Sequence, residues 1–168
     1  RLEGAEGALE PLEAYQKGLF HIQDLSSQKA AAAVNALPEQ LILDSCAAPG
    51  GKTFILSQQM KNTGTLVAAD LHQHRLDTLI QRGERLGLSN IETHALDMKK
   101  YHKELEQYGT FDHILTDVPC SGLGVLRRRP EIKYKNLEVF SSLPKVQYEI
   151  LSSSAKYLKK GGTLVYST

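Results

Sequence analysis

Residues 43–53 read Leu43-Asp-Ser-Cys-Ala-Ala-Pro-Gly-Gly-Lys-Thr53, and this stretch decides the fold. An apolar run precedes it at 41–43 and a helix-compatible segment follows it at 54–60, so the pattern predicts a strand, a tight turn and a helix. The small side chains of the turn let a ligand approach the backbone, and the first turn of the helix offers it free N–H groups. The alternative is a strand-to-helix turn that only packs.

Two common glycine-rich phosphate loops do not fit this stretch. A Walker loop needs a glycine, four further residues and then Gly-Lys-Ser or Gly-Lys-Thr, but its first glycine falls on Cys46. A dinucleotide fingerprint needs three spaced glycines, whereas only the adjacent pair Gly50 and Gly51 is present. The stretch therefore predicts a ligand site that lacks a phosphate-binding loop of either kind.

The composition indicates one domain with no strong charge preference. The chain has 168 residues, 41% of them hydrophobic, and a formal net charge of +1. Two cysteines do not make a disulfide framework, and the six histidines show no metal-ligand spacing with them, so we expect no metal. No apolar run is long enough for a membrane span, and we expect a cytoplasmic protein. The first residue is Arg1 rather than Met, which suggests a piece of a longer protein.

Strand and helix patterns alternate along the chain. This alternation predicts an α/β fold with a doubly wound, mainly parallel sheet. We expect a lead-in segment over 1–37, with a short strand within 15–24 and a helix that Ser26 or Ser27 caps and Pro38 terminates, followed by a core over 38–168. The predicted strands of the core are 41–46, 65–70, 91–97, 111–117 and 163–168, and the predicted helices of the chain are 30–37, 54–61, 76–86, 99–108 and 146–158.

Acidic residues close three of the predicted strands. Asp70, Asp97 and Asp117 each stand at a strand end, where ligands of open α/β sheets bind. A single aspartate at such a place is most often a helix cap or a turn former. Three of them beside the small-residue turn instead outline a nucleoside site, because carboxylates accept hydrogen bonds from ribose hydroxyls and amino groups.

A second cluster follows the fourth predicted strand, where the chain reads Asp117-Val-Pro-Cys-Ser-Gly122. A lone cysteine is usually a small buried hydrophobe, but the flanking proline and glycine favour a stiff, exposed turn and a reactive Cys120. Arg127, Arg128, Arg129 and Lys133 then give the densest positive charge in the chain. Such a run is usually a solvated face, and next to a reactive turn it also suits an RNA phosphate backbone.

These motifs resemble the Sun/Fmu-type RNA (cytosine-5) methyltransferases, particularly the bacterial enzymes that methylate 16S ribosomal RNA. The resemblance runs from about Tyr15 onward, including the closing Gly161-Gly-Thr-Leu-Val-Tyr-Ser-Thr168, and marks the chain as a catalytic-domain fragment. It implies a Rossmann-like S-adenosylmethionine-dependent methyltransferase fold with strand order 3-2-1-4-5, truncated after the fifth strand, and an RNA substrate. Transfer RNA as the substrate, and a cofactor- or RNA-binding module without catalysis, are the alternatives.

The resemblance also implies roles for single residues. Asp70 would hold the ribose hydroxyls, Asp97 would lie at the adenine end, and Asp117 would lie near the methyl donor and the target cytosine. Cys120 would assist product release, while the nucleophilic cysteine is expected directly after Thr168 and is absent from this chain, which should therefore be inactive alone. The residues that would wrap S-adenosylmethionine are Cys46, Ala47, Ala48, Pro49, Gly50, Gly51 and Lys52.

Overall fold

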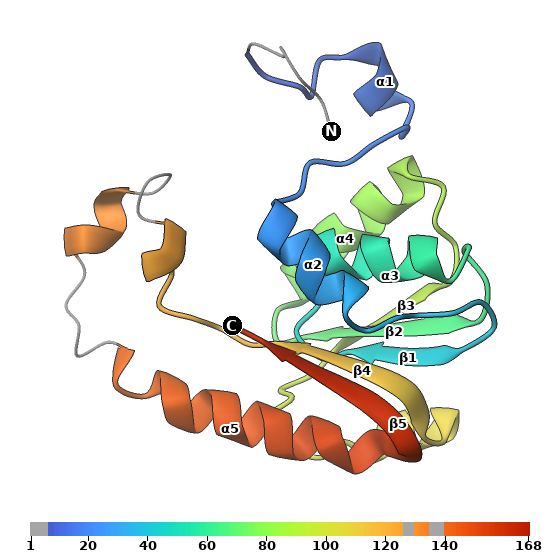
Figure 1. Cartoon of the computed structure of the whole chain (residues 1–168), viewed down its shortest axis with the longest axis vertical. Coiled ribbons are helices and arrows are strands. Elements are labelled where there is room, and N and C mark those ends of the chain that lie inside the picture. The colour runs from blue at the N-terminus through green and yellow to red at the C-terminus, as the bar shows by residue number, and fades with distance from the viewer. Residues whose placement is uncertain (1–6, 126–129, 135–139) are drawn as a thin grey trace.

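A computed structural model describes residues 7–125, 130–134 and 140–168, and Figure 1 shows the whole chain. Its centre is a five-stranded sheet in the order β3-β2-β1-β4-β5, in which every neighbouring pair is parallel. This confirms the predicted fold class and strand order. The strands are β1 (Leu41–Asp44), β2 (Thr65–Asp70), β3 (Ile91–Ala95), β4 (Phe111–Asp117) and β5 (Leu158–Ser167).

Helices cover both faces of the sheet. In Figure 1, α2, α3 and α4 lie over one face and α5 lies over the other. None of the helices in the described ranges is long and apolar enough to cross a membrane. The α-helices are α1 (Glu13–Gln16), α2 (Leu25–Ala32), α3 (Gly51–Gln59), α4 (Gln73–Arg85) and α5 (Leu143–Ser154), and the 3₁₀ helices are η1 (Lys103–Tyr108), η2 (Leu123–Val125), η3 (Pro130–Tyr134) and η5 (Ala155–Tyr157).

The core divides between the two faces because successive strand residues point to opposite sides. In β1, Leu43 packs with Ile150 and Tyr157 on the α5 side, whereas Ile42 packs on the α2 and α3 side. Leu43 and Ile42 are both fully buried. The sheet is therefore covered on both faces, and its free positions for a ligand lie at the ends of the strands.

The lead-in segment differs from the sequence prediction. No strand forms within 15–24. The lead-in segment instead contains α1 and an extended stretch, and Gly18 packs directly on the backbone of Arg85. The helix predicted over 30–37 is α2, which begins after Asp24 and ends at Ala32, well before Pro38. The left-handed conformation of Asn35 (φ 56°) turns the chain there, so proline is not the terminator.

α2 also contributes to the core. Its Ala31 is fully buried, together with Val34 just beyond it, in the cluster that contains Leu56 of α3. The division of the chain into 1–37 and 38–168 stays a prediction.

Several further boundaries are shifted: β1 ends at Asp44 rather than at 46, and α5 covers 143–154 rather than 146–158. β3 ends at Ala95, so Asp97 lies in a turn in which its carboxylate accepts a hydrogen bond from the Lys99 N–H (3.2 Å). This turn delays the helix predicted over 99–108, which forms only as the short η1. β5 begins at Leu158 rather than at 163, because the predicted glycine turn is an irregularity inside the strand: Leu158 pairs with Phe111 and Thr163 with His113.

Candidate cofactor site and adjoining cavity

A cavity of about 490 Å³ lies at the carboxyl ends of the strands, within the roughly 300–1,000 Å³ range of small-molecule sites. The loops after β1, β2, β3 and β4 form most of its wall, and α5 closes it with Val146 and Ile150. Small, apolar and carboxylate side chains therefore surround one space. Besides the two residues of α5, the lining residues are Ser45, Cys46, Ala48, Pro49, Asp70, Leu71, His72, Arg75, Leu96, Asp97, Met98, Lys99, Asp117, Val118, Pro119 and Cys120.

The loop between β1 and α3 needs its glycines. Gly50 adopts a left-handed conformation (φ +102°), and a Cβ there would collide with the side chains of Phe54 and Leu79. The Gly50 N–H also donates to the carbonyl of Ala47 (2.8 Å), and the Ala47 N–H donates to Ala69 of β2 (2.9 Å). The loop is thus tied to the sheet, and only glycine fits at position 50.

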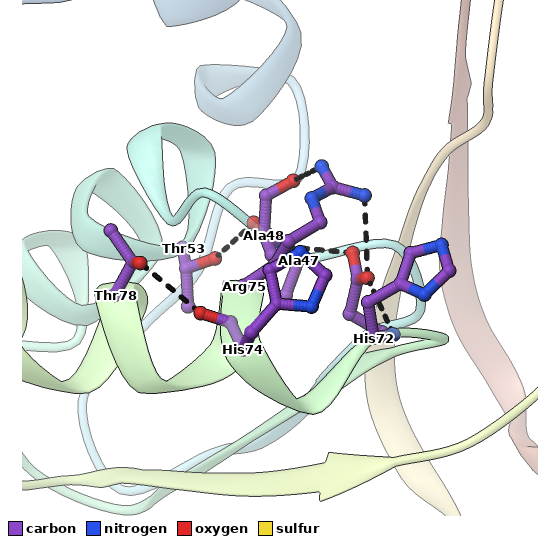
Figure 2. Close-up of polar contacts among 8 residues, drawn as sticks. Ala47, Ala48, Thr53, His72, His74, Arg75 and Thr78 are labelled. Atoms are coloured by element: carbon purple, nitrogen blue, oxygen red, sulfur yellow. Dashed lines mark hydrogen bonds and ion pairs between the residues drawn. The ribbon is translucent and has the colours of Figure 1, made fainter.

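Asp70 organises the cofactor side of this loop. Its carboxylate is 5% exposed and accepts hydrogen bonds from the backbone N–H groups of Ala48 (3.2 Å) and His72 (3.1 Å). Arg75 donates to the same carboxylate (3.3 Å) and, with its other terminal nitrogen, to the Ala48 carbonyl, as Figure 2 shows. Asp70 and Arg75 therefore hold the loop from two sides.

Sequence reasoning missed Arg75. The available signal was its place in the first turn of α4, where a cation opposes the helix dipole and so indicates a partner outside the helix. Asp97 was predicted from the sequence as a site residue. Its carboxylate lies 3.5 Å from the ammonium of Lys99, and it lines the same cavity as Asp70. The structure thus brings the three predicted carboxylates to one cavity.

Lys52 lies away from that cavity. Its ammonium forms an ion pair with the Asp117 carboxylate (2.6 Å), and both side chains are largely buried. Lys52 lines a second cavity of about 190 Å³, and both cavities are lined by Cys46, Ala48, Pro49 and Asp117. Ala47 and Gly51 also line only this smaller cavity, and Gly50 lines neither.

Asp44 lies at the base of the smaller cavity and is 1% exposed. Its Oδ2 accepts a hydrogen bond from the Thr53 hydroxyl (2.8 Å), while its Oδ1 has no hydrogen-bond partner among the described residues. Burial, reinforced by the nearby Asp117 carboxylate and opposed by the Thr53 hydrogen bond, raises the pKa of Asp44 to about 7. Asp44 closes β1 and so carries the same strand-end signal as Asp70 and Asp117, but the strand was predicted to run to residue 46, which hid this signal.

The two cysteines have opposite environments. Burial and the carboxylates of Asp44, Asp70 and Asp117 raise the pKa of Cys46 to about 12, so its thiol is a poor nucleophile. Cys120 is exposed at the edge of the larger cavity, as its Pro-Cys-Ser-Gly turn predicts.

Gln147 of α5, which reasoning from the sequence did not identify as functional, connects two parts of the site. Its side-chain N–H group donates to the Pro119 carbonyl (2.8 Å) and to the Thr168 hydroxyl (3.2 Å). The turn that carries Cys120 is thereby tied to the end of β5.

The predicted RNA contacts stay predictions. Arg127, Arg128 and Arg129 lie outside the described residues, and of Lys133 only the backbone, in η3, is described. Among the described side chains, no group of three or more His, Cys, Asp or Glu residues has a metal-binding arrangement.

Fold and cavity together define the class of protein: a Rossmann-like α/β domain of the S-adenosylmethionine-dependent methyltransferase type. More particularly, the chain belongs to the 16S rRNA methyltransferase RsmB/F family, whose model matches residues 31–168. This confirms the resemblance drawn from the motifs.

Individual relatives agree with the family assignment. A Bacillus subtilis protein described as "Probable ribosomal RNA small subunit methyltransferase B" is 41% identical over 97% of this chain and 36% of its own length. A tRNA (cytosine(72)-C(5))-methyltransferase from Pyrococcus horikoshii is 34% identical over 96% of this chain and 40% of its own. The crystal structure of NSun6 from the same organism, with SFG, matches with a TM-score of 0.84 at 32% identity, over 96% of this chain and 41% of that one. The chain thus spans well under half the length of these relatives.

Proposed function

We propose that the full-length protein carrying this chain transfers a methyl group from S-adenosylmethionine to carbon-5 of a cytosine in RNA, and that this RNA is 16S ribosomal RNA. The observation that carries the proposal is the pair of adjoining cavities, which meet at Asp117 beside the exposed Cys120. One cavity suits a nucleoside cofactor and the other suits a second, smaller group. The family and its ribosomal RNA methyltransferase relatives support the choice of reaction and substrate.

The larger cavity has the chemistry that the cofactor needs. S-adenosylmethionine supplies an electrophilic methyl group when bound. Asp70 would accept hydrogen bonds from the ribose hydroxyls, and Asp97 would lie at the adenine end. The apolar side chains of Leu71 and Met98 also line this cavity and suit the flat face of a purine. Because the Asp70 carboxylate is already fixed by Ala48, its orientation is set before the ligand arrives.

The reaction needs two thiols for separate steps. Carbon-5 of cytosine becomes nucleophilic only after a thiolate adds to carbon-6, and Asp117 would assist this addition by passing a proton to ring nitrogen 3. After methyl transfer the carbon-5 proton leaves to a base, the carbon-6 to sulfur bond breaks, and Cys120 assists this elimination. The family pattern places the attacking cysteine directly after Thr168. Gln147 supports this arrangement, since it ties Thr168 to the Pro119–Cys120 turn.

Cys46 does not serve as the attacking thiol in this scheme. Its pKa of about 12 keeps the sulfur protonated near neutral pH, and a thiol adds to a pyrimidine far more slowly than a thiolate does. A cytoplasmic location is part of the proposal, because the substrate proposed is ribosomal RNA.

Transfer RNA is the second candidate substrate. The tRNA cytosine-5 methyltransferase from Pyrococcus horikoshii aligns with 96% of this chain, so the shared motifs suit either RNA. Methylation assays with 16S ribosomal RNA and with transfer RNA, using the full-length protein, separate the two substrates. A protein that binds the cofactor but methylates neither RNA is a non-catalytic module.

The same assay tests the division of labour between the cysteines. We expect Cys120→Ala to permit attack and methyl transfer but slow elimination, so that enzyme accumulates in covalent linkage with RNA as a shifted band on a denaturing gel. Ser121→Ala is the matched control in the same turn and should give no band. Normal turnover by Cys120→Ala, or activity lost with no trapped adduct, contradicts the role of Cys120 in elimination.

A further inference from the structure

The smaller cavity has a wall that comes from the N-terminal segment. Gln23 and Ser27 line this space of about 190 Å³ together with Lys52 and Asp117. This volume is less than half that of the larger cavity, which makes it too small for the whole cofactor. Its wall carries an amide, a hydroxyl, an ammonium and carboxylate groups beside small residues of the loop between β1 and α3. The smaller cavity therefore suits a compact polar ring next to the cofactor site.

The Gln23 side chain is held in place without being satisfied. Its amide lies against Gly51 at the start of α3, so closely that a Cβ on Gly51 would collide with it. Its backbone carbonyl accepts a hydrogen bond from the Gln28 side chain (3.1 Å), which fixes the chain where α2 begins. The Gln23 side-chain amide makes no hydrogen bond with another described residue. A half-buried amide with a free donor and a free acceptor thus borders the cavity.

Most of the other charged groups of this cavity already have partners among the described residues, and Oδ1 of Asp44 is the exception. Lys52 and Asp117 form an ion pair, and Asp44 receives the Thr53 hydroxyl. An amide is the side chain that presents a donor and an acceptor next to each other, and glutamine and asparagine use this pair to contact the edges of bases. The exocyclic amino group of cytosine is a donor that the amide oxygen can accept from, and ring nitrogen 3 beside it is left to Asp117.

We propose that Gln23 is a base-contacting residue whose amide oxygen accepts a hydrogen bond from the exocyclic amino group of the target cytosine, with the base in the smaller cavity beside Asp117. This inference rests on the proposed function. It makes the N-terminal segment part of the substrate site, whereas the sequence pattern indicated only a lead-in to the core. It also gives a reason for glycine at position 51, since any side chain there would displace the Gln23 amide.

The test compares two RNA substrates with the full-length protein. One carries cytosine at the position that the wild type methylates, and the other carries 2-pyrimidinone there, which lacks only the amino group. On the cytosine substrate we expect Gln23→Ala to lower kcat/KM by roughly ten- to a hundredfold, the range for a good side-chain contact to a base. On the 2-pyrimidinone substrate the same variant should lose less than about threefold, because the contact is already absent.

Two variants and one binding measurement keep the result specific. Gln23→Glu retains an acceptor and should keep more activity on cytosine than Gln23→Ala does. Gln81→Ala, which changes an exposed glutamine on α4, is the control and should match the wild type on both substrates. Calorimetry should give the same S-adenosylmethionine affinity for the wild type and for Gln23→Ala.

Each contrary result has a distinct meaning. Equal losses on both RNAs show that Gln23 only supports the loop and overturn the inference, as does normal activity of Gln23→Ala on cytosine. Weakened cofactor binding places Gln23 in the cofactor site and also overturns it. A wild-type protein that methylates no RNA overturns the proposed function, and this inference with it.

Discussion

Removing the charge at position 44 should stabilise the chain at neutral and alkaline pH. Asp44 is buried beside Asp117, and its pKa rises from an ordinary value of 3.8 to about 7. At roughly 1.4 kcal/mol for each pH unit, ionising Asp44 in the folded chain costs about 4 kcal/mol more than in the unfolded chain. Asp44→Asn keeps the shape and the acceptor for the Thr53 hydroxyl but removes this cost.

The sign of the pH dependence follows from proton binding. Between pH 3.8 and about 7 the folded state holds a proton on Asp44 that the unfolded state has released, so the stability of the wild type falls as pH rises through this range. Asp44→Asn has no such titration. The free energy of unfolding of the variant, relative to the wild type, should therefore increase from pH 4 to pH 7 by up to about 4 kcal/mol and then level off.

Urea denaturation at intervals from pH 4 to pH 9 measures this difference, and Asp77→Asn on the exposed side of α4 is the matched control. A difference between Asp44→Asn and the wild type that does not change with pH would refute the reasoning, because Asp44 would then titrate as an ordinary exposed carboxyl.

Other parts of the site give predictions of the same kind. Gly50→Ala should lower the free energy of unfolding, measured in denaturant, by about 2–5 kcal/mol, because position 50 is left-handed and the new Cβ would overpack against Phe54. Gly87 is also left-handed but has open space around it, so Gly87→Ala should cost only about 1–2 kcal/mol. Equal costs would show that the loop is not tightly packed. Arg75→Met should weaken S-adenosylmethionine binding about tenfold, as measured by calorimetry, because the charged hydrogen bonds of Arg75 are lost. An affinity equal to that of the wild type would mean that Arg75 does not position any group that the cofactor contacts. Reversing the charges of 127–129 in the full-length protein should lower the slope of log affinity for RNA against log salt concentration by about 2, without changing cofactor affinity. An unchanged slope would mean that these arginines form a solvated face and do not contact RNA phosphates.

The sequence was sufficient to predict the sheet and the positions of its carboxylates. Alternating strand and helix patterns indicate a parallel sheet, whose carboxyl ends must share one edge, so Asp70 and Asp117 had to lie close together. Asp97 reaches the same cavity although its strand ends two residues earlier, because the turn after β3 leads along that edge. Family motifs then indicated the chemistry at this edge.

The partners of the site residues could not be predicted in the same way. Lys52 and Asp117 are 65 residues apart, and Arg75 reaches Ala48 across 27 residues, so these contacts depend on how the helices pack. Gln147 carries no sequence signal of its own, since glutamine is ordinary on a partly exposed helix. Gln23 lies within the stretch that resembles the family, but the resemblance gave it no role. α2 was placed too late because its short apolar face is weak and tertiary packing decides where it begins.

The central claim is that the cavity at the strand ends binds S-adenosylmethionine through Asp70. Isothermal titration with S-adenosylmethionine and with S-adenosylhomocysteine, on the wild type, Asp70→Asn and the exposed control Asp77→Asn, tests it most directly. We predict binding of both ligands to the wild type and to Asp77→Asn, and a loss of roughly ten- to a hundredfold in affinity for Asp70→Asn, the value of one or two hydrogen bonds to a charged group. Equal affinity in a folded Asp70→Asn, or no binding to the wild type, would contradict the claim.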